Sequence, residues 1–128
     1  MPTSPRVFVF AGGGTGGHIY PALAIAEQVR ERDPEARCRF LCSTRPLDSE
    51  ILRAENVEFT PIGAAPFGAH PKRLAKFMLS WPGAVRESRE AIVETFRGAD
   101  PRSAWLVSLG GFVCPPAASA ARRMGMRT

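Results

Sequence analysis

Short apolar runs alternate with stretches of helical periodicity along this chain of 128 residues. The apolar runs have the length and composition of buried strands, and each is followed by turn residues and then by a helical pattern. They lie at residues 7–10, 37–42, 57–62 and 105–109. This alternation predicts an α/β fold: a Rossmann-like, doubly wound parallel sheet with helices on its faces.

The expected helices are placed by apolar spacing and by stop signals. Residues 21–32 carry five apolar side chains on the face that we expect to pack on the sheet: Ala22, Leu23, Ile25, Ala26 and Val29. Asp33-Pro34 ends this helix. A short helix is expected around Ile51 and Leu52, and two further helices are expected on either side of Pro82-Gly83. The last helix is expected at 117–124, with Gly125 as its C-terminal stop.

A glycine-rich loop, Gly12-Gly13-Gly14-Thr15-Gly16-Gly17-His18, separates the first apolar run from the first helix. Glycines allow positive φ and close approach of a ligand, so the backbone N–H groups of such a loop can surround an anion. The N-terminus of the following helix adds a partial positive charge at the same point. The loop therefore predicts phosphate binding, with the titratable side chain of His18 beside the phosphates.

Three kinds of phosphate loop are compared with this motif. A nucleoside-triphosphate loop ends in Gly-Lys-Ser/Thr, and Gly17-His18-Ile19 excludes it. A dinucleotide loop, G-x-G-x-x-G, is formally present, but the second strand lacks the acidic residue that holds a ribose. Arg45 could bind a 2′-phosphate there, so an NADP-type nucleotide-binding module stays open. The loop of a sugar-transferring enzyme is the interpretation that also accounts for His18.

Two motifs resemble a known family. Gly-Gly-Thr-Gly-Gly-His, followed by Ile-Tyr-Pro-Ala-Leu-Ala-Ile-Ala, is similar to the N-terminal signature of the MurG family, in glycosyltransferase family 28. Residues 107–113, Val-Ser-Leu-Gly-Gly-Phe-Val, resemble that family's second glycine-rich loop. Phe112 in place of the usual Tyr, and Cys114-Pro115-Pro116 in place of Ser-Gly-Pro, are departures from the family pattern.

The resemblance implies the N-terminal half of a GT-B glycosyltransferase. Its reaction would be inverting transfer of N-acetylglucosamine (GlcNAc) from UDP-GlcNAc to a polyprenyl-pyrophosphate-linked sugar, forming lipid II for peptidoglycan. Residues 1–128 would be the acceptor-side domain, ending before its last strands, where another parallel strand is expected to begin near Met126. A C-terminal donor-binding domain or a separate subunit would complete the enzyme, and this chain alone would be inactive. A split transferase, or one acting on another lipid or a sterol, remains an alternative.

The resemblance also implies site roles. His18 would be the catalytic base, because imidazole titrates near neutral pH and can accept the proton of an acceptor hydroxyl; a capping or phosphate-binding role is the alternative. Gly14, Thr15, Gly16 and Gly17 would bind the pyrophosphate of the nucleotide sugar, and Gly110, Gly111 and Phe112 the acceptor. We expect these two loops to face each other, because ligands of open α/β sheets bind at the carboxyl ends of the strands.

Composition narrows the range of partners. Seventeen basic and 12 acidic residues give a formal net charge of +5, which suits an anionic partner. Nucleic acid is not expected, since the basic residues are scattered and form no known binding module. No Asp-x-Asp pair is present, so we expect neither a metal ion nor another cofactor. Cys38, Cys42 and Cys114 lack metal-ligand spacing and are expected to be buried free thiols.

A basic amphipathic segment lies at residues 72–81. Leu74, Phe77, Met78 and Trp81 form one helical stripe, flanked by Lys72, Arg73 and Lys76. Such a stripe can be a core face, or it can contact a membrane, where basic residues and Trp favour the interface. Both interpretations stay open. No apolar run approaches the ~20 residues that span a bilayer. The resemblance, whose acceptor is a lipid pyrophosphate in the cytoplasmic leaflet, implies a cytoplasmic and peripheral location on the inner face of the cell membrane.

Overall fold

The computed structural model describes residues 4–13 and 16–128. Its centre is a parallel four-stranded sheet in the order β3-β2-β1-β4. The strands are β1 (Val7–Gly12), β2 (Arg37–Cys42), β3 (Phe59–Pro61) and β4 (Ala104–Gly110). The predicted α/β, doubly wound parallel sheet is confirmed. The third strand is shorter than predicted, because only Phe59–Pro61 pairs with β2.

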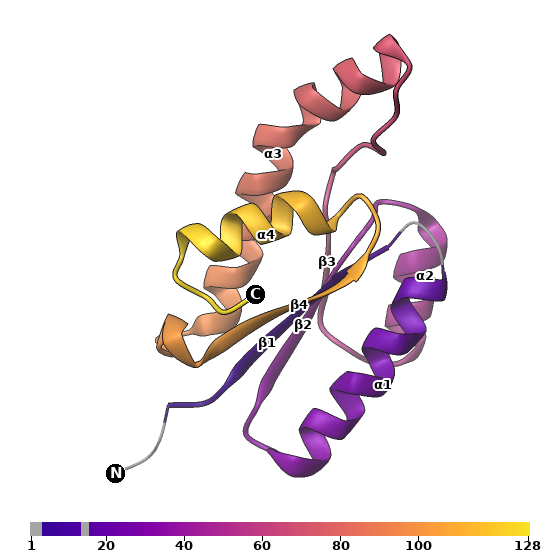
Figure 1. Ribbon diagram of the computed structural model, residues 1–128. Coiled ribbons are helices and arrows are strands. Elements are labelled where there is room, and N and C mark those ends of the chain that lie inside the picture. Colours follow the sequence, from indigo (N-terminus) through magenta and orange to yellow (C-terminus); the bar gives the residue numbers. More distant parts are fainter. Residues whose placement is uncertain (1–3, 14–15) are drawn as a thin grey trace.

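Helices cover both faces of the sheet (Figure 1). α1 (Gly16–Arg32) and α2 (Pro46–Ala54) lie on one face, and α3 (Pro71–Phe96) and α4 (Cys114–Arg123) on the other, with a 3₁₀ turn at Pro101–Ser103 before β4. β1, β2 and β3 follow one another toward one edge, and the chain then crosses through α3 to place β4 on the opposite side of β1. The strand order therefore reverses between β1 and β4.

Alternation along the strands divides the core between the two faces. In β1, Val7 and Val9 pack toward α3 and α4, whereas Phe10 packs with Phe40 toward α1. Cys38 and Cys42 share the α1 side of β2, as the alternation predicted, and both are buried free thiols. Burial, assisted by the nearby Asp48 carboxylate, raises the pKa of Cys42 to about 12. Cys42 is therefore a neutral thiol near pH 7.

The opposite face of β2 carries a buried cation that the sequence patterns did not indicate. The guanidinium of Arg39 donates to the hydroxyl oxygens of Thr95, at 2.7 Å, and Thr60, at 3.0 Å. It also pairs with the exposed carboxylate of Glu58 at 3.3 Å. These partners compensate for the desolvation of the charge and tie β2 to α3 and β3.

Two helix predictions are wrong. α1 begins at Gly16 rather than at Pro21, and Ile25, expected to face the sheet, is 40% exposed, whereas Ile19 is buried. The two helices expected on either side of Pro82-Gly83 are one continuous helix, α3. Proline removes a single backbone hydrogen bond there. Burial of Ala84, Ala91 and Ile92 against the sheet holds the second half of α3 in line.

Because α3 runs through Gly83, replacing this glycine by alanine is expected to stabilise the domain. A Cβ at Gly83 would meet no atom within 4 Å, and alanine favours a helix interior over glycine by about 0.5–1 kcal/mol. Chemical denaturation of the Gly83→Ala variant measures this gain. Gly98→Ala is the matched control: its Cβ also meets nothing, but its φ of +86° makes the substitution strained. A loss of stability in Gly83→Ala would contradict the continuous helix.

The last residues of the chain lie along the outer edge of β4. Arg127 forms an isolated parallel bridge with Trp105. Its N–H donates to the carbonyl of Ala104 at 3.0 Å, and its carbonyl accepts from Leu106 at 2.8 Å. The guanidinium of Arg127 also lies over the Trp105 ring, 5.1 Å from its centroid.

Candidate functional site

The two glycine-rich loops meet where the strand order reverses. β1 and β4 are neighbours, and their last paired residues are Gly12 and Gly110, with a register shift just before them. In open α/β sheets, ligands bind outside the carboxyl ends of the strands at such a reversal, because the loops there diverge and leave a crevice. The expected juxtaposition of these strand ends is therefore present.

His18 lies between the two loops. It is in the first turn of α1, half-buried, and its ring rests on the backbone of the loop after β4. A Cβ at Gly110 would be 3.2 Å from His18 Nε2, and one at Gly111 would be 3.4 Å from Nδ1. The glycines, at φ +110° and +91°, therefore give the imidazole room to approach the second loop.

The Nδ1 atom of His18 is buried and, within residues 4–13 and 16–128, has no hydrogen-bond partner. A neutral imidazole presents one donor and one acceptor nitrogen, so it can hold or take a proton while it contacts a ligand. The ring therefore lies close to the backbone of Gly110 and Gly111, with its buried Nδ1 unpaired among the described residues.

The loop after β1 is also enclosed on the β2 side. A Cβ at Gly13 would lie 2.6 Å from the amide nitrogen of Ser43 and 2.7 Å from Asp48 Oδ2. Asp48 is buried at the start of α2 and accepts hydrogen bonds from the amide and hydroxyl of Ser43. Sequence reasoning missed this pair. The only available signal was a serine and an aspartate on either side of the Arg45-Pro46 helix start.

Arg45 and Cys114 also lie close to the carboxyl end of β4 and the loop that follows it. The exposed Arg45 guanidinium lies over the ring of Phe112, 5.9 Å from its centroid, so the loops after β2 and β4 bring a cation and an aromatic ring together. The Cys114 thiol lies 3.1 Å from the carbonyl oxygen of Ala11 and 3.2 Å from that of Gly110. It thereby links the ends of β1 and β4 from the start of α4.

Three of the residues predicted to bind pyrophosphate are not described by the structure, or are described only in part. Gly14 and Thr15 lie outside the described residues, and Gly16 is known only as the first residue of α1. Their assignment to pyrophosphate binding stays a prediction. Among the residues that are described, no cluster of three or more His, Cys, Asp or Glu side chains could hold a metal ion.

The predicted amphipathic stripe lies on the end of α3 that extends beyond the rest of the domain (Figure 1). Leu74 and Met78 are 38% and 64% exposed, while Phe77 and Trp81 are half-buried and pack on each other with ring centroids 5.7 Å apart. Lys72, Arg73 and Lys76 are exposed around them. The stripe is thus neither fully exposed nor a core face. Over the described residues, no helix has the length and apolar character to cross a membrane.

Comparison with known proteins gives one consistent family. A family model described as the glycosyltransferase family 28 N-terminal domain matches residues 8–128. A relative from Paenarthrobacter aurescens is 36% identical over 123 residues, covering 95% of this chain and 32% of the relative. It is named UDP-N-acetylglucosamine--N-acetylmuramyl-(pentapeptide) pyrophosphoryl-undecaprenol N-acetylglucosamine transferase. A protein of the same name from Acidothermus cellulolyticus is 40% identical over 122 residues, covering 92% of this chain and 31% of that protein.

Solved structures agree in fold. A crystal structure of Acinetobacter baumannii MurG has a TM-score of 0.73 at 22% identity, covering 95% of this chain and 34% of that one. A UGT transferase from Siraitia grosvenorii in complex with UDP has a TM-score of 0.60 at 19% identity, covering 94% and 26%. The chain spans about a third of the length of the curated relatives it matches. It belongs to glycosyltransferase family 28 as an N-terminal domain, and the MurG resemblance predicted from its glycine motifs is confirmed.

Proposed function

We propose that this chain is the acceptor-side domain of an enzyme that transfers GlcNAc from UDP-GlcNAc to a hydroxyl of a polyprenyl-pyrophosphate-linked muramyl pentapeptide. The reaction is that of the transferase for which the relatives are named. The observation that carries the proposal is the position of His18 against Gly110 and Gly111, at the strand reversal where ligands of such sheets bind.

In the proposed mechanism, His18 removes the proton of the acceptor hydroxyl. The acceptor oxygen forms a bond to the anomeric carbon of GlcNAc as the bond from that carbon to UDP breaks, and UDP leaves with the electron pair. Attack from the face opposite UDP inverts the configuration. Backbone N–H groups of Gly14–Gly17 and the N-terminus of α1 stabilise pyrophosphate charge, while Gly110, Gly111 and Phe112 position the acceptor.

A reconstitution experiment tests this function. The chain is joined to the donor-binding domain, or mixed with a donor-binding subunit, and UDP release is measured with UDP-GlcNAc and the prenyl-linked muramyl pentapeptide. We expect turnover in the completed enzyme and none with this chain alone. A completed enzyme that uses another lipid or a sterol, and rejects the muramyl acceptor, would overturn the substrate assignment. A completed enzyme inactive with every acceptor would overturn the transferase role.

We also propose that the projecting end of α3 contacts the inner face of the cytoplasmic membrane. Exposed Met78 and Leu79, at 64% and 83%, lie on the same segment as Lys72, Arg73 and Lys76. Apolar side chains can enter the lipid interface, while the three cations attract anionic headgroups by about 1 kcal/mol each. The enzyme would then be cytoplasmic and peripheral, close to a lipid-linked acceptor.

Vesicle binding tests this membrane contact. Met78→Glu is expected to weaken binding to anionic vesicles at low salt without changing the thermal midpoint, because it places a carboxylate where lipid would be. Added salt should weaken the wild type, since charges are screened over ~10 Å at 0.1 M. Val93→Glu, at a 51% exposed apolar position near the other end of α3, is the matched control. Equal losses in both variants would rule out a contact localised to the projecting end.

A further inference from the structure

The turn between β2 and α2 has a buried carboxylate at its centre. Asp48 and its partner Ser43 are each 1% exposed. Asp48 Oδ2 accepts a hydrogen bond from the amide of Ser43 at 3.0 Å and a second one from the Ser43 hydroxyl. Such bonds replace part of the hydration that a carboxylate loses on burial. The proposed chemistry does not use this carboxylate, although it lies beside the loop after β1.

Hydrogen bonds within the turn depend on the same pair. The Ser43 hydroxyl oxygen accepts from the amide of Arg45 at 3.3 Å, and the Arg45 carbonyl accepts from the amide of Asp48 at 3.1 Å. Arg45 is the N-cap residue of α2, and Pro46 follows it in the first turn of the helix. Removal of the carboxylate would therefore release both the amide and the hydroxyl of Ser43, and with them the shape of the turn.

The turn is in close contact with the loop after β1. A Cβ at Gly13 would lie 2.6 Å from the Ser43 amide nitrogen and 2.7 Å from Asp48 Oδ2. The carbonyl oxygen of Gly13 is in turn 2.6 Å from where a Cβ at Gly111 would be, and that Cβ would be 3.4 Å from His18 Nδ1. Close contacts thus run from the buried carboxylate, through both glycine loops, to the imidazole.

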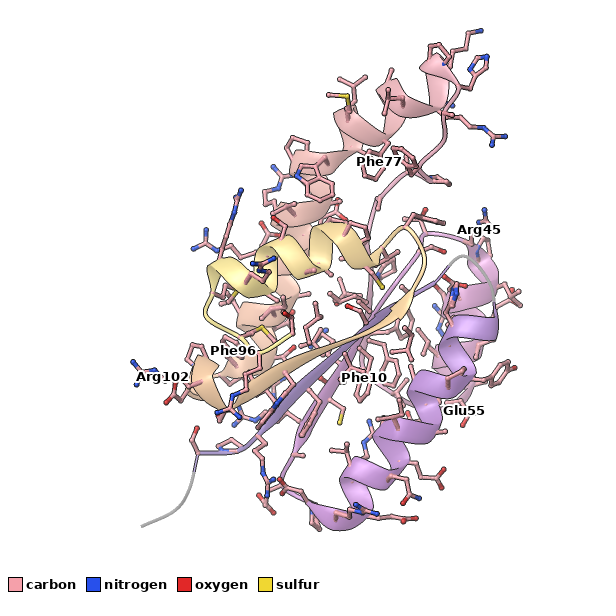
Figure 2. All side chains as sticks on the ribbon, viewed as in Figure 1. Phe10, Arg45, Glu55, Phe77, Phe96 and Arg102 are labelled. Carbon is pink, nitrogen blue, oxygen red and sulfur yellow. The ribbon has the colours of Figure 1, made fainter. Side chains whose placement is uncertain are left out.

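A second contact joins the same turn to the loop after β4. The Arg45 guanidinium lies over the Phe112 ring, 5.9 Å from its centroid. Figure 2 shows Arg45 at the end of the sheet where β4 turns toward α4, whereas Phe96 and Arg102 lie at the opposite end. The turn therefore touches one glycine loop through Gly13 and the other through Phe112.

We propose that Asp48 is a positioning residue: by holding Ser43, it sets the place of the loop after β1 and, through that loop, the place of the His18 imidazole. The catalytic consequence rests on the proposed function, whereas the positioning is a property of this chain alone. A displacement of about 1 Å at a reacting group can lower a rate about 10²-fold. Asp48 can therefore affect the reaction without touching a substrate.

Imidazole NMR signals of this chain test the positioning without any reaction. The chain has two histidines, and His70 is the internal reference because it caps the projecting end of α3. Asp48→Ala is expected to shift the His18 signals and to leave the His70 signals unchanged. Ser43→Ala keeps the carboxylate charge and should shift the same signals by a smaller amount. It decides the question if Asp48→Ala does not fold, and it separates displacement of the ring from loss of a nearby charge.

Leu52→Ala is the matched control for a general loss of stability. Leu52 is 0% exposed in α2, one turn beyond Asp48, and belongs to the core on the α1 side of the sheet. Its truncation leaves a cavity but keeps the hydrogen bonds of Ser43. The His18 signals should therefore stay near their wild-type positions. Signals that do not move in Ser43→Ala and Asp48→Ala, or that move equally in Leu52→Ala, would overturn the proposal.

Kinetics of the enzyme completed with its donor-binding half separate positioning from loss of folded protein. An unfolded fraction lowers the apparent kcat but leaves KM unchanged, because the folded molecules bind normally. Displacement of the loop after β1 in Asp48→Ala should instead raise the KM for UDP-GlcNAc at least about fivefold, since this loop carries the proposed pyrophosphate donors. It should also lower kcat about 10- to 100-fold. Leu52→Ala is expected to keep the wild-type KM.

The two measurements distinguish failure of this inference from failure of the proposed function. Turnover with a wild-type donor KM in both Asp48→Ala and Ser43→Ala would overturn the positioning role and leave the transferase. No turnover in the completed wild type, together with His18 signals that move in Asp48→Ala and not in Leu52→Ala, would overturn the transferase. Asp48 would then remain the residue that places the loop after β1.

Discussion

His18→Ala, made in the protein completed with its donor-binding half, is expected to lower kcat by ~10²–10⁴ with little change in the KM for UDP-GlcNAc. An acceptor hydroxyl is a poor nucleophile until its proton is withdrawn, and His18 is the titratable side chain that the glycines of both loops surround. The donor KM should change little, because the proposed mechanism assigns the pyrophosphate to backbone N–H groups and not to the imidazole. Steady-state kinetics with both substrates varied measures the two parameters separately.

Since the ring of His18 also packs on Gly110 and Gly111, a structural loss must be separated from a catalytic one. His18→Asn provides this control, because the amide keeps a polar, hydrogen-bonding side chain of similar width but cannot act as a base at neutral pH. Both variants should be almost equally inactive and should retain the wild-type thermal midpoint. Substantial activity in His18→Asn would assign His18 to hydrogen bonding, and unchanged kcat in His18→Ala would remove it from the chemistry.

Gly111→Ala is expected to have the second largest effect, on both stability and activity. A Cβ there would be 2.6 Å from the carbonyl oxygen of Gly13, a separation at which the backbone of one loop must move. The φ of +91° adds strain, and such conformations cost non-glycine residues about 1–3 kcal/mol. Denaturation should show a loss of at least this size, and kcat/KM should fall at least about tenfold, since the crevice would be displaced around His18.

Gly98→Ala separates backbone strain from the clash between loops. Gly98 has a similar φ of +86°, but its Cβ would meet no atom within 4 Å, and it follows α3, away from the crevice. It is expected to lose stability through strain alone and to keep its activity. If Gly111→Ala and Gly98→Ala lost equal stability and both stayed active, the close approach of the two glycine loops would be refuted.

The local pattern of apolar and polar residues was sufficient to predict most of the secondary structure. The run at 37–42 predicted β2 with its bounds, and strict alternation placed Cys38 and Cys42 on one buried face with Phe40. The glycine loop with a histidine at its end predicted a phosphate-type site and, by resemblance, the family that the comparison confirms. Periodicity and glycine spacing are properties of neighbouring residues, so they can be read without knowing the fold.

The local pattern was not sufficient where contacts between elements distant in the chain determined the structure. Pro82 is a strong local signal for a helix break, but α3 continues because its second half is buried against β1, β2 and α4. Ile25 has the apolar character of a core residue, yet it is 40% exposed, because the buried side of α1 is formed by Ile19, Ala22 and Ala26.

By itself, therefore, the sequence determined the α/β class, the positions of the strands and the identity of the glycine motifs. Only the tertiary structure decided that Gly111 meets His18, that Gly13 fits against Ser43 and Asp48, and that Phe67 and Phe112 line one groove. Each of these pairs joins residues far apart in the chain. The contacts of Gly111 and Phe112 depend on the crossover that places β4 beside β1, and the contact of Gly13 depends on the pairing of β1 with β2. Strand order is a global choice that no local spacing encodes.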